Sequence, residues 1–388
     1  MSIHEEICSA IDRYQEKAVR VSHEIHEHPE PKFEERFASG LLIGAATEMG
    51  LQVEKNVGGL STAFRAEFGK QGPAVAILAE YDALPNGHSC GHNLIACAAL
   101  SAVAGLKSIE SRLPGRIVFL GTPAEEGGGG KIILLEKGAF NGVDAAMMAH
   151  PTDSEWSTMP ALATKHLHFT FLGRAAHAAL APWDGSSALE AVLQMFYSVD
   201  MARLHFRDGS RIHGIITNGG QAVNIIPEKT ECQFLARAKT SRHAQEMAQR
   251  VIRCAEAAAM ATGTRVEHQA VGGYKNMINN RSIATRYSVH SETLGVQTRE
   301  APPDLPTGST DMGDISHAIP SIHPVFAISR RGEGTCHEDA FVKHADSPHG
   351  YEAMIRVAKA LAMTAYDLLS DPELLKSAKA EFDQRKES

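Results

Sequence analysis

Short apolar runs alternate with helical stretches in the first part of the chain. The runs at 74–79, 116–121 and 144–149 predict strands, and the patterns at 92–109 and 131–137 favour helices between them. Alternation of strand and helix is typical of a largely parallel sheet with helices on both faces. We therefore expect an α/β fold here.

The middle of the chain, about 165–274, has a different order of elements. We expect, in chain order, a strand at 167–172, a helix at 187–204, strands at 211–217 and 229–239, a helix at 242–262 and a strand at 264–271. This βαββαβ order predicts a four-stranded sheet backed by two helices, a ferredoxin-like unit. A strand at 322–328 and a helix at 347–369 then resume the α/β pattern, so the ferredoxin-like unit is expected to be inserted. The predicted domains are a discontinuous one at 1–164 and 275–388, and an inserted one at 165–274.

Composition and charge narrow the class of protein. Hydrophobic residues make up 43% and charged residues 22% of the 388 residues, which is ordinary for a soluble globular protein. The net charge of −8 argues against a nucleic-acid-binding protein, whose surface would be basic.

The start of the chain and its cysteines bear on the compartment. Residues 1–20 are polar and acidic, with apolar residues at helical spacing, and they lack the apolar core of a signal peptide. No apolar run approaches the roughly 18 residues of a membrane span. The six cysteines show no disulfide-framework spacing. We expect a cytoplasmic protein that does not interact with membranes.

Polar clusters follow the carboxyl ends of the predicted strands. They are Glu80-Tyr81-Asp82, Cys90-Gly91-His92, Glu125-Glu126, His150 and His337. Ligands of open α/β sheets bind at this end of the strands, so these groups are expected to converge. Cysteine, histidine and glutamate from separate loops would form a shell suited to zinc or a similar ion.

Each of these signals also has a simpler interpretation. Cys90 is either a ligand two positions before His92 or a buried cysteine ahead of a helix-capping Asn93. Glu125-Glu126 is either a metal ligand beside a proton acceptor or a solvated acidic turn. A lone histidine at a strand end, such as His150, is more often structural. Cys336 is either a second thiol ligand or a buried thiol.

Other enzyme classes lack their motifs in this sequence. There is no Gly-x-Gly-x-x-Gly between a strand and a helix, and no zincin or inverzincin helix. The glycine run that ends at Lys131 lacks the first glycine and the Ser/Thr of a phosphate loop.

Seven motifs in order resemble one family, the zinc aminoacylase and carboxypeptidase family of metallopeptidases (family M-twenty). The resemblance is strongest to the branch with the p-aminobenzoyl-glutamate hydrolases and the aminoacylase-like dipeptidases. The motifs lie at 26–30, 80–85, 89–94, 122–127, 173–178, 219–227 and 308–313.

The resemblance implies a set of site residues in the discontinuous domain. One or two divalent ions would be held by Cys90, His92, Glu126, His150 and His337. Glu125 would be the general base and later the acid, and Asp82 would orient a metal ligand.

The resemblance also implies roles for the inserted domain. It would be a lid that also forms a homodimer. His177 would reach a partner subunit's site to stabilise the tetrahedral intermediate. Asn224, Arg237 and Ser309 would contact the substrate, and Arg237 would bind the carboxylate of the substrate.

One departure from the family's main branch concerns the metal. That branch has His-x-Asp where this chain has Glu80-Tyr81-Asp82, and a bridging carboxylate in the region of Cys90-Gly91-His92. A thiolate favours zinc, whereas carboxylate and imidazole ligands also take manganese or cobalt.

We therefore expect a metal-dependent amidohydrolase that acts on a small substrate carrying a carboxylate, such as an N-acyl amino acid, an aroyl-glutamate or a dipeptide. The alternatives are hydrolysis of an aryl C–N bond and a non-catalytic metal-binding protein on the same scaffold.

Overall fold

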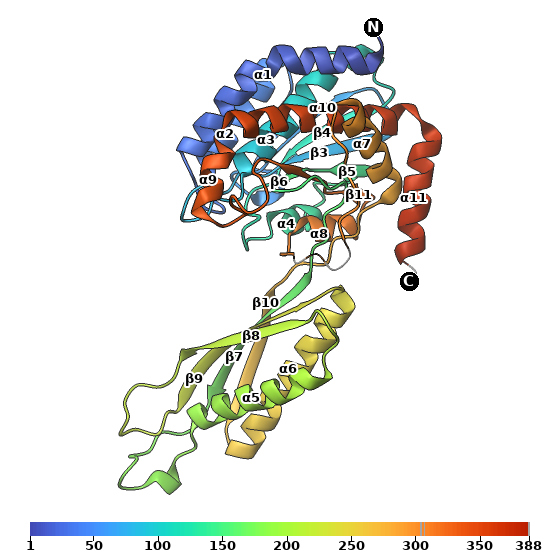
Figure 1. Cartoon of the computed structure of the whole chain (residues 1–388). Helices are drawn as coiled ribbons and strands as arrows, with labels where there is room; N and C mark the ends of the chain where they lie inside the picture. Colours follow the sequence, from blue (N-terminus) through green and yellow to red (C-terminus); the bar gives the residue numbers. More distant parts are fainter. Residues whose placement is uncertain (303–304, 306, 387–388) are drawn as a thin grey trace. The chain divides into compact units, whose positions relative to one another are not determined.

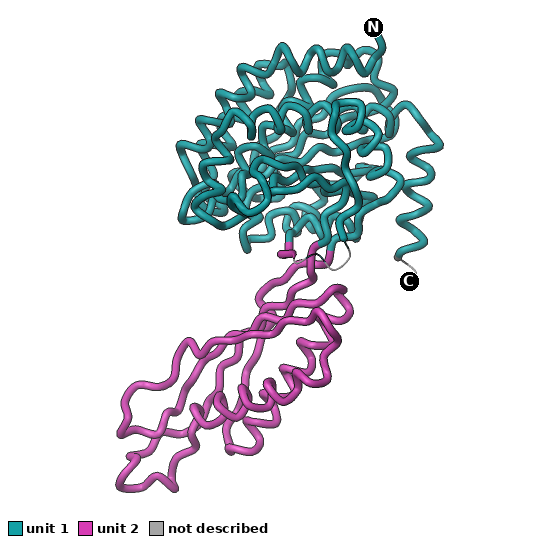
Figure 2. The backbone as a smooth tube through the Cα atoms, in the orientation of Figure 1, with its two compact units in different colours: residues 1–160, 277–306, 310–388 teal, residues 161–276, 307–309 magenta. Residues whose placement is uncertain are grey.

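The computed structural model describes residues 1–302, 305 and 307–386, and it divides into two compact units (Figure 2). Unit 1 comprises Met1–Pro160, Met277–Pro306 and Thr310–Ser388. Unit 2 comprises Ala161–Asn276 and Thr307–Ser309.

A six-stranded, mainly parallel sheet forms the centre of unit 1. Its strands, in spatial order, are β1 (Val53–Lys55), β2 (Phe64–Gly69), β4 (Arg116–Gly121), β3 (Ala74–Ala79), β5 (Ala145–Met147) and β11 (Ser321–Ile322). The pairs β4–β3, β3–β5 and β5–β11 are parallel, whereas β1 and β2 are antiparallel to their neighbours. Every residue of β3 is buried, because helices cover both faces of a parallel sheet.

Helices cover the two faces of this sheet (Figure 1). Figure 1 shows α1 (Ile3–Glu27), α3 (His92–Lys107) and α10 (Pro348–Ser370) on one face, and α4 (Gly130–Glu136) and α8 (Met312–Ser316) on the other. The remaining helices of unit 1 are α2 (Arg36–Glu48), α7 (Arg281–Thr293), α9 (Asp339–Ala345) and α11 (Pro372–Lys386). No helix among the described residues is long and apolar enough to cross a membrane.

The predicted strands at 74–79 and 116–121 are confirmed, but two other strand predictions were wrong in detail. The run at 144–149 is not one strand: β5 ends at Met147, and His150 begins a separate strand, β6 (His150–Thr152). The run at 322–328 is also divided, between β11 and β12 (Val325–Ala327), which pairs with β6. Pro324 lies at this division, where it has no N–H to donate to a ladder. His150 therefore opens a strand and does not end one.

Unit 2 contains a four-stranded antiparallel sheet and two helices. In chain order its elements are β7 (Ala163–Leu172), α5 (Ala188–Ala202), β8 (Arg211–Asn218), β9 (Lys229–Ala238), α6 (Ser241–Thr262) and β10 (Arg265–Gly272). The sheet order is β10-β7-β9-β8. Residues of β9 alternate between buried and more exposed, as expected for a sheet with helices on one face. The use of this unit as a lid or a dimerisation domain stays a prediction.

Unit 2 has its own hydrophobic core, and its two ends lie together. The core is made by side chains of the sheet and of both helices, including Phe169, Met195 and Met247. At the ends, the backbone N–H of Thr164 donates to the carbonyl of Tyr274 at 2.8 Å. The chain therefore leaves unit 2 beside the point where it entered.

Candidate metal centre

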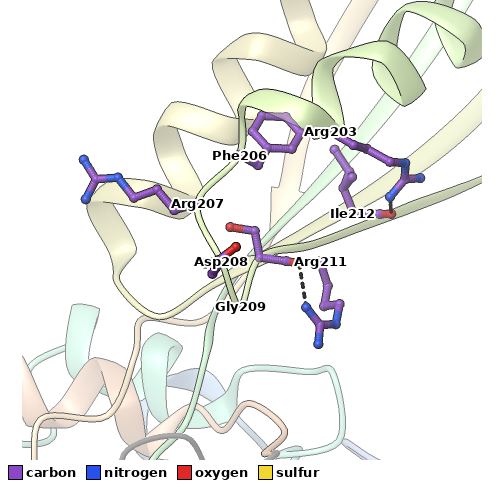
Figure 3. Close-up of a pocket in the computed structure, with 8 residues that line it drawn as sticks. Arg203, Phe206, Arg207, Asp208, Gly209, Arg211 and Ile212 are labelled. Atoms are coloured by element: carbon purple, nitrogen blue, oxygen red, sulfur yellow. Dashed lines mark hydrogen bonds between the residues drawn. The ribbon is translucent and has the colours of Figure 1, made fainter.

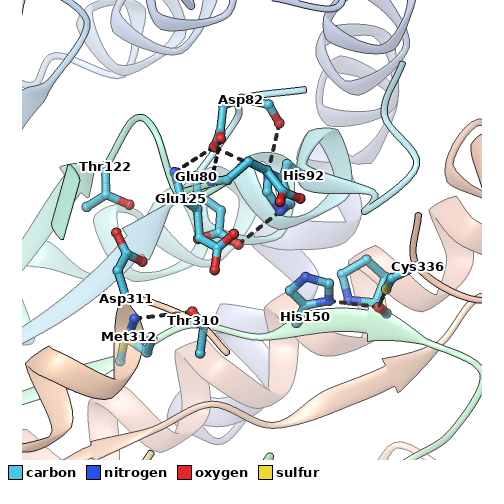
Figure 4. Close-up of polar contacts among 12 residues, drawn as sticks. Glu80, Asp82, His92, Thr122, Glu125, His150, Thr310, Asp311, Met312 and Cys336 are labelled. Atoms are coloured by element: carbon cyan, nitrogen blue, oxygen red, sulfur yellow. Dashed lines mark hydrogen bonds and ion pairs between the residues drawn. The ribbon is translucent and has the colours of Figure 1, made fainter. Parts of the chain in front are cut away.

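The side chains expected to bind metal come from four segments at one end of the unit 1 sheet. Cys90 lies in the loop after β3 and His92 is the first residue of α3, whereas Glu126 lies in the loop after β4 and His337 in the segment between β12 and α9. Asp82, which is expected to orient a ligand, also lies in the loop after β3. His150 is the first residue of β6. Figure 4 shows Asp82, Glu125 and His92 close together, with His150 and Cys336 nearby.

The first group of ligand-type atoms is Cys90, His92 and Glu126. One ligand atom from each lies within 4.8 Å of the others. His337 is not a member of this group, but the Nε2 atom of its largely exposed side chain is 3.7 Å from Oε1 of Glu126. The structure thus brings together a thiol, two imidazoles and a carboxylate from three segments.

His150 lies in two further groups. Its ligand atom is within 4.8 Å of those of Cys90 and Cys336, and also of those of Glu80 and His92. All five predicted ligands therefore lie in one connected cluster. Glu80 and Cys336 are additional members of that cluster.

Three buried polar atoms in this cluster have no hydrogen-bond partner among the described residues. They are Oε1 of Glu80 and Nε2 of His92, which lie 3.4 Å from each other as an ion pair, and Oε1 of Glu126. A buried polar atom without a partner is destabilising by about 1–3 kcal/mol, so three such atoms at one place need an explanation. Lone pairs of thiol, imidazole and carboxylate groups that face one another fit a divalent cation such as zinc.

The two buried histidines are oriented by their other ring nitrogen. Nδ1 of His92 donates to the carbonyl of Asp82 at 2.8 Å, and Nδ1 of His150 donates to the carbonyl of Pro151 at 2.8 Å. Each ring therefore carries a proton on Nδ1, which leaves Nε2 as the nitrogen available to a metal ion. This is the arrangement expected of histidines that bind metal through Nε2.

Asp82 holds the backbone of the two adjacent glutamates. Its Oδ1 accepts from the N–H of Glu125 at 3.1 Å and its Oδ2 from the N–H of Glu126 at 2.9 Å. The preceding residue, Ala124, has a left-handed backbone with φ of 63°, which a non-glycine residue adopts only when its surroundings impose it. Oε1 of Glu35 accepts from the N–H of Ala124 at 2.8 Å and helps to fix this turn.

Glu125 is buried beside the cluster. Burial, together with the charges of Glu80, Asp311 and Glu126, raises the pKa of the Glu125 carboxyl well above its ordinary value. A carboxyl with raised proton affinity can accept a proton from water and later give it up, as a general base and acid must. The positive charge of a bound cation would act in the opposite direction on this pKa.

Sequence reasoning missed a fully buried ion-pair triad behind the cluster. Lys131 Nζ is 2.5 Å from Oε2 of Glu80 and 2.8 Å from Oδ1 of Asp311, and the three side chains are 0% exposed. Burial tends to raise the pKa of Glu80, but Lys131 and nearby histidines outweigh it and lower the pKa to about 2. The available signal was a lysine in the otherwise uncharged stretch from Gly127 to Leu135.

Two further buried histidines were also not predicted. His88 and His323 are buried, and neither ring nitrogen of His323 has a hydrogen-bond partner among the described residues. Burial lowers the pKa of each to about 3, so both are neutral at pH 7. The ring of His323 lies 5.8 Å from that of His150, centroid to centroid.

The other predicted site residues belong to unit 2 and are described within it. Nδ1 of His177 accepts from the N–H groups of Ala179 and Leu180, each at 3.2 Å. The carbonyl of Asn224 accepts from the N–H of Ala178 at 3.0 Å, so the loops of His177 and Asn224 are adjacent.

Arg237 and Ser309 form a second pair within unit 2. The Nη1 atom of Arg237, on β9, donates to Oγ of Ser309 at 3.3 Å. Burial lowers the pKa of Arg237, although a guanidinium remains charged at neutral pH.

A basic pocket also lies in unit 2, at the turn between α5 and β8 (Figure 3). Its volume is about 250 Å³, and Arg203, Arg207 and Arg211 are among the residues that line it. None of the predicted site residues lines this pocket.

Comparison with known proteins gives three consistent findings. The sequence model of peptidase family M20/M25/M40 matches residues 76–360. A mouse protein named Xaa-Arg dipeptidase is 38% identical over 393 residues, which cover 96% of this chain and 90% of the mouse protein. A p-aminobenzoyl-glutamate hydrolase polypeptide of Escherichia coli K12 is 30% identical over 464 residues, which cover 98% of this chain and 95% of that protein.

A solved structure from Bacillus subtilis shares the fold. It is described as a dinuclear metal-binding peptidase from the M20 family, and it matches with a TM-score of 0.73 at 21% identity. The match covers 92% of this chain and 99% of that chain.

Proposed function

Since the chain belongs to peptidase family M20/M25/M40, and is thus a hydrolase of amide bonds, we propose that it uses a divalent ion bound at the cluster in unit 1. The substrate class we propose is a small amide that carries a carboxylate. The observation that carries this proposal is the convergence of thiol, imidazole and carboxylate atoms, three without hydrogen-bond partners among the described residues, beside the buried Glu125. A non-catalytic role is not retained, because the relatives that cover nearly all of this chain are named as enzymes.

The ligands we propose are the five predicted ones, Cys90, His92, Glu126, His150 and His337. A divalent ion bound there supplies Lewis acidity and lowers the pKa of water from about 15.7 to about 7. The Cys90 thiolate favours zinc, and manganese or cobalt would suit the carboxylate and imidazole ligands.

Glu125 is the proposed proton carrier of the reaction. Its carboxylate accepts the proton of the attacking water and delivers it to the nitrogen of the leaving amine. Such general base and acid catalysis typically contributes about 10²–10⁴-fold in rate. Asp82 fixes the backbone of Glu125 through the 3.1 Å hydrogen bond, which limits where the carboxylate can move.

For unit 2 we propose the roles that the family resemblance implies. His177 stabilises the oxyanion of the tetrahedral intermediate, and Arg237 binds the substrate carboxylate through its guanidinium. Asn224 and Ser309 contact the substrate. The hydrogen bond from Arg237 to Ser309 supports a shared role for these two residues.

The names of the relatives suggest which substrates to test first. One is named as a dipeptidase for Xaa-Arg and another as a hydrolase of p-aminobenzoyl-glutamate. We therefore propose a panel of dipeptides with C-terminal arginine, p-aminobenzoyl-glutamate and N-acyl amino acids.

The adjacent glutamates provide the sharpest test of the proposed function. Glu125→Gln should retain the bound metal and lose about 10²–10⁴-fold in kcat on the best substrate, because only the proton carrier is removed. Glu126→Gln should instead lose metal, because a ligand is removed. Metal content by elemental analysis and kcat, measured on the same preparations, separate the two roles. Near-normal turnover of Glu125→Gln would show that the proton carrier is another group.

A further inference from the structure

Cys336, Cys90 and His150 form a second group of ligand-type atoms. Its composition differs from that of the group of Cys90, His92 and Glu126. One ligand atom from each of Cys90, His150 and Cys336 lies within 4.8 Å of the others. The group has two thiols and one imidazole, and no carboxylate. Figure 4 shows Cys336 beside His150.

The chain holds Cys336 in this place through its neighbours. The N–H of His337 donates to the carbonyl of Ser89 at 2.9 Å, next to Cys90 in sequence. The side-chain amide of Asn86 donates to the carbonyl of His337 at 3.3 Å. His337 itself has φ of 76°, a left-handed backbone that a non-glycine residue adopts only under constraint. The two segments are thus tied together where their cysteines meet.

The Cys336 thiol makes only weak hydrogen bonds, and one of them is with the Cys90 thiol. The contact of Cys336 with the carbonyl of Pro151 is 3.6 Å long, and thiols are weak donors. Hydrogen bonding alone therefore does not account for a second thiol beside Cys90.

The geometry is close to that of a zinc site. At a Zn–S distance of about 2.3 Å and tetrahedral angles, two ligand sulfurs lie about 3.8 Å apart. Separations within 4.8 Å therefore need only small side-chain movements to enclose one ion. Two cysteines and one histidine, with a fourth position open, are one of the ligand sets of catalytic zinc sites.

We propose that Cys336 is a metal ligand. With Cys90 and His150 it forms a zinc subsite that is rich in thiolate. This subsite adjoins the group of Cys90, His92 and Glu126. Cys90 belongs to both groups. The proposal rests on the proposed function and adds to it a residue that selects the metal. Two thiolates favour zinc over manganese, which prefers carboxylate and water oxygens.

The test uses the full-length protein, freed of metal and titrated with Co²⁺, whose thiolate complexes absorb in the near ultraviolet. Cys336→Ser and Cys336→Ala should each lose about a third to a half of the thiolate-to-cobalt absorption at saturation, because one of two soft ligands is gone. Cys8→Ser is the matched control: Cys8 is also partly buried, lies on α1 and belongs to none of the metal-type groups found among the described residues. It should leave the absorption unchanged.

Competition between zinc and manganese gives a second readout. The preference for zinc should fall by about tenfold or more in both Cys336 variants, and remain in Cys8→Ser. Wild-type absorption and preference in both Cys336 variants, with loss only in Cys90→Ser, would overturn the proposal and leave the proposed function intact. No thiolate absorption in the wild-type protein would overturn the proposed function and this inference together.

Discussion

Lys131 is a buried cation held between two buried carboxylates. Its Nζ contacts Glu80 and Asp311, and its backbone N–H also donates to Oδ2 of Asp311 at 2.9 Å. Removing one partner of a buried ion pair leaves a charge in a poorly solvating environment. This makes Lys131 more important to stability than a surface lysine.

We expect Lys131→Met to lower the free energy of unfolding by about 3–5 kcal/mol, because Glu80 and Asp311 would be buried without a cation. Lys379→Met is the control, since Lys379 pairs with Asp144 at the surface and its side chain is 48% exposed. That change should lower stability by less than about 1 kcal/mol. Denaturant titration of both variants tests this, and equal losses would contradict the role given to the triad.

The metal-type residues could be predicted from their positions, but the triad could not. Cys90, His92 and Glu126 each follow a strand of the sheet, and a local pattern is enough to show this. Lys131 is 51 residues from Glu80 and 180 from Asp311, and no local pattern links them. Such pairs are set by the way the chain folds back on itself.

Gly91 allows two ligand loops to approach each other. It has a left-handed backbone with φ of 69° and immediately precedes α3. A Cβ atom at this position would lie 2.7 Å from Cγ of Pro151, the residue after His150. Glycine therefore meets two requirements here, one of backbone conformation and one of space.

Gly91→Ala should weaken metal binding, because the added methyl group pushes Pro151 away. The same clash should lower the free energy of unfolding by about 1–3 kcal/mol, in addition to the penalty of a left-handed backbone. Gly50→Ala is the matched control: Gly50 has φ of 78°, but a Cβ there would meet nothing within 4 Å. It should show only the left-handed penalty of about 1–2 kcal/mol. Thermal unfolding and metal titration measure both effects. Equal stability and metal affinity in the two variants would show that close approach is unimportant.

At the scale of elements, the continuous apolar strands were the easiest to predict. The runs of β3 and β4 are apolar almost throughout, and their bounds agree with the prediction. β2 was missed although its buried residues alternate with partly exposed ones, such as Arg65 and Glu67, a period-two pattern that indicates a strand. The divided strands show a different limit: an apolar run does not reveal that its hydrogen-bond partner changes part of the way along.

A surface of unit 2 is a candidate interface for the predicted homodimer. Helix α5 carries apolar side chains at spacings of three or four residues that are exposed in the single chain. They are Leu193, Tyr197 and Met201, followed by Leu204 just after the helix. Exposed apolar side chains gathered on one helix face typically mark an interaction site.

We expect the wild-type protein to sediment with the mass of two chains and the double variant Tyr197→Glu, Met201→Glu with the mass of one. Two buried charges without partners would be strongly unfavourable at such an interface. Met260→Glu is the control, since Met260 is 85% exposed on the other helix of unit 2. It should leave the mass unchanged. A double variant with the mass of two chains would place the interface elsewhere, and a wild-type mass of one chain would contradict the dimer.

The two ends of unit 2 lie side by side, which affects how readily this unit can be exchanged during evolution. Because β7 and β10 are paired strands, and Thr164 contacts Tyr274, the insert joins its host through neighbouring points. An inserted unit attached in this way can be lengthened, exchanged or deleted while the strands of unit 1 keep their register. Only a short connection between neighbouring points of the chain has to be rebuilt. The residues of unit 2 can then diverge while the cluster in unit 1 stays as it is.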